Sequence, residues 1–465
     1  MMGRFLCLLC IAMSTGPAVG AESLVIEHVN VIAMTPHADV QQDMTVEIRD
    51  GRIVALRADR TGPRATKYPI IDGRGKWLVP GFADMHVHLE NERMGRLYMP
   101  DSKLPRSALV TEDALLPYVA NGVLQVAALG AMSETLAQRN EVESGRVLGP
   151  HIAAAAMIDG DPPILPVGIT RVASTPEQGR QAVRDAVVED YDLIKIYSRV
   201  SLATFLAIVD EAAKHKIKVI GHLPERNAGL TEKLFVPGFG MVAHAEEFAM
   251  QTSPPDLARI PAYAELARKS GTWLATTLTL DSRIVQQMRD LASANGRAEI
   301  GYLPPELQAM TIYANPYAKT ATPDTIRFVE QVVEFNRTLV KEFAARGVPW
   351  VVGTDALNPG VIPGFSFHDE LEELVAAGLS PSSVLEAATR LPAEWLGTAA
   401  DRGSIAVGKR ADLVLLEGNP LETISNTRRI GAVIVNGHYL PRSELDDRMK
   451  KLRKKRMLSP VSQGG

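Results

Sequence analysis

Apolar residues form short runs along the whole chain, and the runs differ in kind between its ends and its middle. At both ends they are β-rich and separated by turn residues, as at Asp50-Gly51, where Asp-Gly between two such runs is a hairpin signal. The β-rich runs are residues 24–33, 44–49, 52–56, 403–416 and 430–437. Two β blocks this far apart in sequence would most simply pair into one small domain built from both ends of the chain.

In the middle of the chain, short apolar strands alternate with longer helical stretches such as residues 176–189, 201–214 and 325–346. The predicted strands are a first one ending at His88, then residues 122–127, 151–156, 192–197, 217–222, 241–244, 272–277 and 349–355. Eight such units predict an α/β fold, a (β/α)8 TIM barrel whose active site lies at the carboxyl ends of the strands.

The expected domains follow from these two patterns. The barrel spans residues 81–400, and a small β-sandwich domain combines residues 22–80 with residues 401–440. Residues 441–465 form a basic tail, for which a solvated terminal helix is the favoured interpretation.

The first 21 residues have the pattern of a secretory signal peptide, with a basic start, an apolar run and small residues before a cleavage point. We therefore expect an exported, periplasmic or secreted protein with no stable membrane insertion after cleavage. Cys7 and Cys10 both lie in this segment, so the mature chain has no thiolate to bind a metal. The formal net charge of −4 argues against nucleic acid as a main partner. A small-molecule substrate is the expected partner.

His86 and His88 stand two positions apart at the end of the first barrel strand. Side chains in a strand alternate with period two, so both imidazoles project to the same side. Paired neutral imidazoles suit a transition metal, most commonly zinc.

Further polar residues interrupt or end the later strands. Lys195 lies inside an apolar strand, where a buried cation is costly. Together with it, the metal-capable side chains expected at one rim of the barrel are His86, His88, His222, His244 and Asp355. Each has an ordinary structural explanation, but so many at matching strand ends predict a metal site.

These residues resemble the amidohydrolase superfamily. The resemblance lies in Val-Pro-Gly-Phe-Ala-Asp-Met-His-Val-His (residues 79–88), in the surroundings of the later strand-end residues, and in the closing patterns at residues 387–397 and 403–414. It covers nearly the whole mature chain and is nearest to the imidazolonepropionase-like and Xaa-Pro dipeptidase-like branch. That branch often has Arg-Asp in strand two, where this chain has Val-Ala-Ala-Leu (residues 126–129).

The resemblance implies a binuclear centre of two divalent ions, by default Zn2+, bridged by Lys195 carboxylated at its side-chain nitrogen. His86, His88 and Asp355 would complete the first ion's ligands, and His222 and His244 the second's. A bridging hydroxide would attack the carbonyl of a C–N bond, and Asp355 would act as general acid and base.

Other interpretations stay open from the sequence. One is a mononuclear cyclic-amide hydrolase or deaminase, and another is a non-catalytic metal- or ligand-binding protein on the same scaffold. Tyr197 and Arg199, just after the Lys195 strand, are candidate substrate contacts, and a homo-oligomer is typical of the family. Three long loops, residues 91–111, 159–172 and 301–323, are expected over the active-site face.

Overall fold

The computed structural model describes residues 23–36, 40–58, 66–89, 110–165, 169–224 and 229–457. The predicted signal peptide and most of the loop expected after the first barrel strand lie outside these ranges, so both stay predictions. None of the helices in the described ranges has the length and apolar character needed to cross a membrane.

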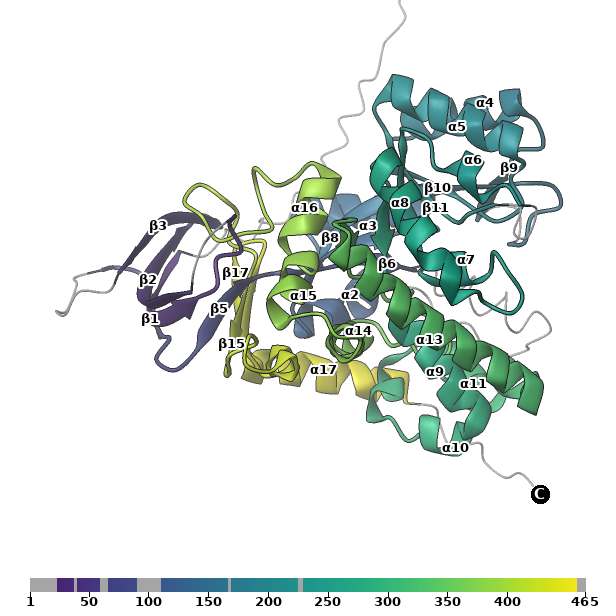
Figure 1. Ribbon diagram of the computed structural model, residues 1–465. Helices are drawn as coiled ribbons and strands as arrows, with labels where there is room; N and C mark the ends of the chain where they lie inside the picture. The colour runs from purple at the N-terminus through teal and green to yellow at the C-terminus, as the bar shows by residue number, and fades with distance from the viewer. Residues whose placement is uncertain are drawn as a thin grey trace, which may run out of the picture.

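The predicted barrel is confirmed (Figure 1). Its parallel strands, in spatial order, are β6 (Phe82–Val87), β7 (Val123–Ala128), β8 (His151–Asp159), β10 (Leu193–Ile196), β11 (Lys218–Gly221), β12 (Phe239–Ala243), β13 (Trp273–Ala275) and β14 (Trp350–Val351). The short β9 (Thr170–Val172) pairs with β8. The ring closes between β6 and the segment after β14, where Met85 N–H donates to Val352 O at 2.8 Å and Asp355 N–H to His86 O at 2.8 Å.

Helices follow the barrel strands and surround them. They are α2 (Thr111–Ala120), α3 (Ser133–Glu143), α4 (Pro176–Val188), α5 (Leu202–His215), α6 (Thr231–Leu234), α7 (Glu246–Ala249), α8 (Ile260–Ser270), α9 (Leu278–Arg289), α10 (Leu291–Ala294), α11 (Pro305–Tyr313), α12 (Pro316–Lys319), α13 (Pro323–Ala345), α14 (Phe365–Ala376), α15 (Pro381–Ala387) and α16 (Arg390–Leu396). Among the described residues, the 3-10 turn η1 (Leu257–Arg259) precedes α8, η2 (Ala298–Tyr302) lies between α10 and α11, and η3 (Ile424–Arg428) lies beyond α16.

A second sheet is built from both ends of the chain, as predicted. Its order is β17 (His438–Pro441), β16 (Ile430–Val435), β15 (Leu413–Leu416), β5 (Trp77–Pro80), β1 (Leu24–Val31), β2 (Gln41–Arg49) and β3 (Arg52–Ala58), with β4 (Ile70–Asp72) beside β1. It is one continuous sheet, and its two halves share an apolar core in which Ile26 and Ile48 lie with Leu413 and Ile434. Strands β5 and β15 pair antiparallel, which joins the two ends of the chain.

One expectation about loops is wrong. Residues 301–323 were expected as a long loop, but α11 and α12 occupy most of that stretch. The reason is the position of the prolines: Pro305 and Pro316 stand in the first helical turn, where a missing N–H costs nothing and the fixed φ suits a helix. Tyr317, in α12, consequently has a fixed place beside the barrel mouth.

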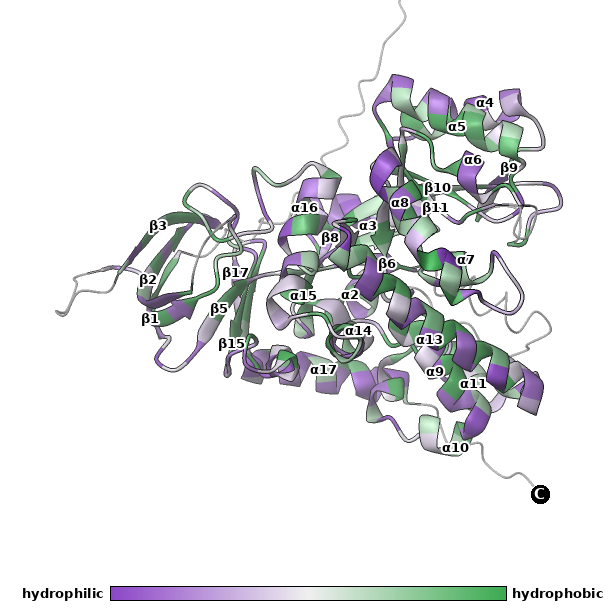
Figure 2. Cartoon of the chain, viewed as in Figure 1, coloured by the Kyte–Doolittle hydropathy of each residue, from purple (hydrophilic) through white to green (hydrophobic). Residues whose placement is uncertain are grey.

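The basic tail forms the predicted helix, α17 (Arg442–Arg456), which lies along α2 (Figure 1). Its polar residues predominate in Figure 2, yet Leu445, Met449 and Leu452 are buried on one face. The helix is therefore packed on the barrel along one side and solvated on the other.

His151, the first residue of β8, joins the amino-terminal rim of the barrel to the second sheet. Its Nδ1 lies 2.6 Å from Glu143 Oε1 and its Nε2 lies 3.0 Å from Asp412 Oδ2. Burial lowers the pKa of His151, but the carboxylates of Asp412 and Glu143 outweigh burial and hold that pKa above its usual value. The histidine therefore has a structural role, at the rim opposite to the candidate metal ligands.

We expect His151→Gln to destabilise the protein in a pH-dependent way. A histidine whose pKa is raised by folding contributes stability that is full below its unfolded pKa of about 6.5 and is lost as pH rises through the folded value. The variant should therefore lose about 3 kcal/mol at about pH 6 and clearly less at about pH 9. Thermal unfolding of both proteins at the two pH values measures this, and an equal loss at both would contradict it.

Candidate metal centre

The side chains predicted from strand ends line one cavity of about 390 Å3 at the carboxyl rim of the barrel. They are His86 in β6, His88 just after it, Lys195 in β10, His222 after β11, His244 after β12, and Asp355 after β14. Alternation along β10 explains how Lys195 reaches the interior: Leu193 packs inside the barrel, whereas Ile194 and Ile196 pack against the surrounding helices. Parallel strands bring all these ends to the same rim.

Two histidines, one at the end of β6 and one just after it, converge on Asp355. Its Oδ1 lies 3.0 Å from His88 Nε2 and 3.3 Å from His86 Nε2. One ligand atom from each of the three residues lies within 4.8 Å of the others. This arrangement is the size of a coordination sphere for a single cation.

His222 and His244 complete a contiguous group of imidazoles. The ring centroids of His86 and His244 are 4.3 Å apart, and those of His222 and His244 are 5.1 Å apart. His222 Nδ1 lies 2.7 Å from Ser198 Oγ and 3.2 Å from Glu247 Oε1. A hydrogen bond at Nδ1 fixes the ring and the tautomer, which leaves Nε2 as the nitrogen for a ligand in the cavity.

His244 is held in the same manner, since its Nδ1 lies 3.0 Å from Thr277 Oγ1. The pattern of an imidazole with Nδ1 bonded to an oxygen and the other nitrogen at a cavity is typical of metal-binding histidines. Neither Glu247 nor Thr277 was identified from the sequence. Glu247 carried one weak signal, because it is an acidic residue three positions after a candidate ligand.

Burial and neighbouring charges set the protonation of the site. Burial first, then His244 and Lys195, hold the pKa of His86 well below its usual value, so this imidazole is neutral and has a lone pair to offer. Burial raises the pKa of Asp355, but the hydrogen bond from His88 and the charges of His244 and Lys195 outweigh it and lower that pKa. The carboxylate is therefore ionised, as a metal ligand and a proton acceptor require.

Asp84, which sequence reasoning missed, fixes the segment that carries Asp355. Its Oδ2 accepts from Thr354 Oγ1 at 2.7 Å, and its Oδ1 from Thr354 N at 3.0 Å. Burial raises the pKa of Asp84 to about 7, against the hydrogen bonds from Thr354 and His86 N. The available signal was an acidic residue inside an otherwise apolar strand, two positions before the first histidine.

Several residues around the same rim have strained backbone conformations. Residues other than glycine with positive φ include His244 at 87°, Thr277 at 53°, Asp355 at 59° and Leu357 at 90°. Such conformations cost about 1–3 kcal/mol each, persist only where the surroundings enforce them, and cluster at functional sites. Two of the four are candidate ligands, and a third touches one of them.

The remaining cavity wall is partly apolar and partly polar. It consists of Met157, Ile164, Leu165, Leu280 and Ile284, with Tyr197, Ser198, Glu246, Tyr317 and Asn358 as its polar part. Tyr197 therefore lies where a substrate contact was predicted, with its ring centroid 4.3 Å from that of His222. Arg199 is exposed, is not among the described residues that line the cavity, and donates to Pro162 O at 2.9 Å.

A buried acid lies next to Glu246. Asp281 accepts from Asn336 Nδ2 at 2.8 Å and is hydrogen-bonded to Glu246. Burial, followed by the charge of Glu246, raises the pKa of Asp281 well above its usual value. A protonated Asp281 can thus donate to Glu246, which keeps two neighbouring carboxyl groups from repelling each other.

The donor set fits divalent metal ions. It combines four imidazoles, of which His86 is neutral, with an ionised carboxylate and a lysine, all buried or partly buried around one cavity, and two of its histidines are held by oxygens at Nδ1. Nitrogen and oxygen donors of this kind suit zinc and also other first-row ions. His86 Nδ1 is a ring nitrogen of the group that is buried without a hydrogen bond among the described residues.

Comparison with known proteins agrees with this arrangement. A sequence model of the amidohydrolase family matches residues 77–440. The imidazolonepropionase of Symbiobacterium thermophilum is 27% identical over 400 residues, which cover 79% of this chain and 82% of that protein.

Among solved structures, a Xaa-Pro dipeptidase with methionine bound in its active site is similar with a TM-score of 0.69 at 20% identity, covering 90% of this chain and 100% of the other. The bottromycin amidohydrolase is similar with a TM-score of 0.71 at 23% identity, covering 95% and 92% of the two chains. At these identities the structures demonstrate a shared fold.

Proposed function

The chain belongs to the amidohydrolase family, and from that premise we propose that it is a metal-dependent hydrolase that cleaves an amide or peptide-like C–N bond of a small substrate. The observation that supports this most is the convergence of imidazoles, lysine and an ionised aspartate from different strands on one cavity. The apolar walls beside that group suit a substrate with an apolar part.

The residues divide between two metal sites in this proposal. His86, His88 and Asp355 would hold one ion, and His222 and His244 the other, with Lys195 between them. For Lys195 to bridge, its unprotonated amine must add to CO2 and lose a proton, which turns a buried cation into an anionic carbamate with two oxygens. Bound divalent ions lower the pKa of water and polarise a carbonyl group.

Asp355 would carry the proton during hydrolysis. As an ionised carboxylate at the cavity, it can accept a proton from the attacking water and deliver it to the leaving nitrogen. Thr354 and Asp84 hold the backbone beside it, and Tyr197 would contact the substrate.

A mononuclear cyclic-amide hydrolase is the second candidate. Two observations favour it: a curated relative is an imidazolonepropionase, and the three-residue group of His86, His88 and Asp355 is by itself compact enough for one ion. In that case Lys195 would stay uncarboxylated.

Dialysis against a chelator tests the proposal. We expect hydrolysis of dipeptides or N-acyl amino acids to fall at least about a hundred-fold after metal removal and to return with added zinc, manganese or cobalt. Cyclic amides assayed in parallel separate the two candidates. Hydrolysis that survives complete metal removal would contradict both.

A further inference from the structure

The turn after β13 has a strained conformation that something must hold. Thr277 lies in the left-handed region at φ 53° and ψ 36°. For a β-branched residue this is an outlier, because its side chain crowds the backbone there. Thr277 is also the residue whose hydroxyl lies 3.0 Å from His244 Nδ1. The strain therefore sits at a contact with a candidate metal ligand.

Glu370, in α14, holds this turn by accepting three hydrogen bonds from it. Its Oε1 accepts from Thr276 Oγ1 at 2.5 Å and from Leu278 N at 2.9 Å, and its Oε2 accepts from Thr279 N at 2.6 Å. The side chain has no exposed surface. Three donors on one carboxylate leave the turn little freedom, since each residue on either side of Thr277 is bonded to the same rigid group.

The turn at residues 276–279 also connects the ends of three strands. Thr277 N–H donates to Gly353 O at 3.2 Å, two residues before Asp355, and Ala245 N–H donates to Thr276 O at 3.2 Å, one residue after His244. Displacement of the turn would consequently move the backbone on both sides of the candidate centre.

We propose that Glu370 is a positioning residue of the metal centre: by fixing residues 276–279, it sets Thr277 Oγ1 against His244 Nδ1 and keeps His244 Nε2 available to a metal. Glu370 acts through Thr277 and touches neither metal nor substrate. This inference rests on the proposed function, because it takes His244 as a ligand.

The first test is the zinc affinity of metal-depleted protein, measured by competition with a chelator. Glu370→Gln keeps the size of the side chain but turns an NH2 towards groups that are themselves donors, so at least one of the three bonds is lost. Zinc binding at one site should weaken about 10- to 100-fold. Glu370→Asp, which keeps the carboxyl group but shortens the side chain, should also weaken zinc binding and serves if the Gln variant does not fold.

The matched control is Glu373→Gln on the same helix. It removes a partly exposed carboxylate that pairs with Arg337 at 2.6 Å. Its zinc affinity should equal that of the native chain.

A double-mutant cycle separates positioning from general stabilisation. Thr277→Ser keeps the hydroxyl and should keep the zinc affinity, whereas Thr277→Ala should weaken binding about as much as Glu370→Gln. If Glu370 acts through Thr277, the two losses do not add. The zinc affinity of the double variant Glu370→Gln/Thr277→Ala should then equal that of whichever single variant binds zinc less tightly.

Additive losses in the cycle, or a Glu370→Gln protein with a lower melting temperature and native zinc affinity, would overturn the positioning role alone. A native chain that binds no zinc would overturn the proposed function and this inference together.

Discussion

Asp355→Asn is expected to lower kcat/KM at least about a thousand-fold, because in the proposed mechanism this one change removes both a charged metal ligand and the group that moves the proton. The ionised Oδ1 that faces His86 and His88 becomes part of a neutral amide, which coordinates metal weakly and cannot accept a proton. Asparagine is the fitting substitute, since it tolerates the left-handed backbone at φ 59° better than alanine does.

Steady-state kinetics on any substrate that the native chain hydrolyses measure this effect. Asp401→Asn is the control, because it also neutralises an aspartate, one whose ion pair with Arg52 is largely exposed. The control should keep native activity. An Asp355→Asn protein with more than about a tenth of native activity would remove Asp355 from the catalytic role.

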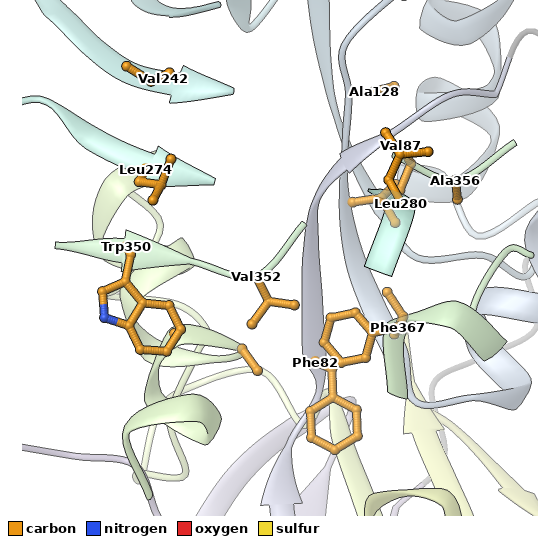
Figure 3. Close-up of a cluster of buried hydrophobic side chains, with 14 of the residues drawn as sticks. Phe82, Val87, Ala128, Val242, Leu274, Leu280, Trp350, Val352, Ala356 and Phe367 are labelled. Carbon is orange, nitrogen blue, oxygen red and sulfur yellow. The ribbon is translucent and has the colours of Figure 1, made fainter. Parts of the chain in front are cut away.

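Phe82→Ala is expected to have the largest effect on stability, about 4 kcal/mol. Phe82 begins β6, has no exposed surface, and stacks on Phe367 with ring centroids 5.6 Å apart (Figure 3). Truncation leaves a cavity at the base of the strand that carries His86. The neighbouring rings of Phe367 and His368 belong to one helix packed against the barrel and have little room to close the gap.

Unfolding in denaturant compares Phe82→Ala with Val188→Ala, whose side chain is 85% exposed and whose loss should change stability by less than about 0.5 kcal/mol. Metal content of the folded Phe82→Ala protein should stay native, because no candidate ligand is altered. A loss of stability below about 1 kcal/mol would show that Phe82 packs less tightly against Phe367 and His368 than the structure indicates.

The pattern of the sequence was sufficient to predict the barrel and its candidate metal ligands, for a physical reason. Parallel strands bring their carboxyl ends to one rim, so polar residues that end apolar strands, such as His222 and His244, must meet there. The turn chemistry was equally direct: Asp50-Gly51 closes the β2–β3 hairpin with both residues at positive φ, as a two-residue turn requires.

The residues that hold the candidate ligands in place could not be predicted from the sequence in this way. Glu370 bonds Thr276 across 94 positions of sequence, and Asp84 bonds Thr354 across 270, so only the folded chain brings them together. In the sequence each is an ordinary acidic residue, and Glu370 stands among the other acids Asp369, Glu372 and Glu373. The helices in residues 305–319 were missed because the stretch was expected to be a loop, although Pro305 and Pro316 stand where a helix can begin.

The central claim, a centre bridged by Lys195, is tested most directly by the metal content of each chain. The native protein and Lys195→Ala, both purified with bicarbonate and zinc, are analysed by elemental mass spectrometry. We predict about two metal ions per native chain, falling to one or none in the variant together with loss of hydrolysis. A single ion per chain, bound equally well with and without Lys195, would contradict the bridged centre and favour the mononuclear cyclic-amide hydrolase.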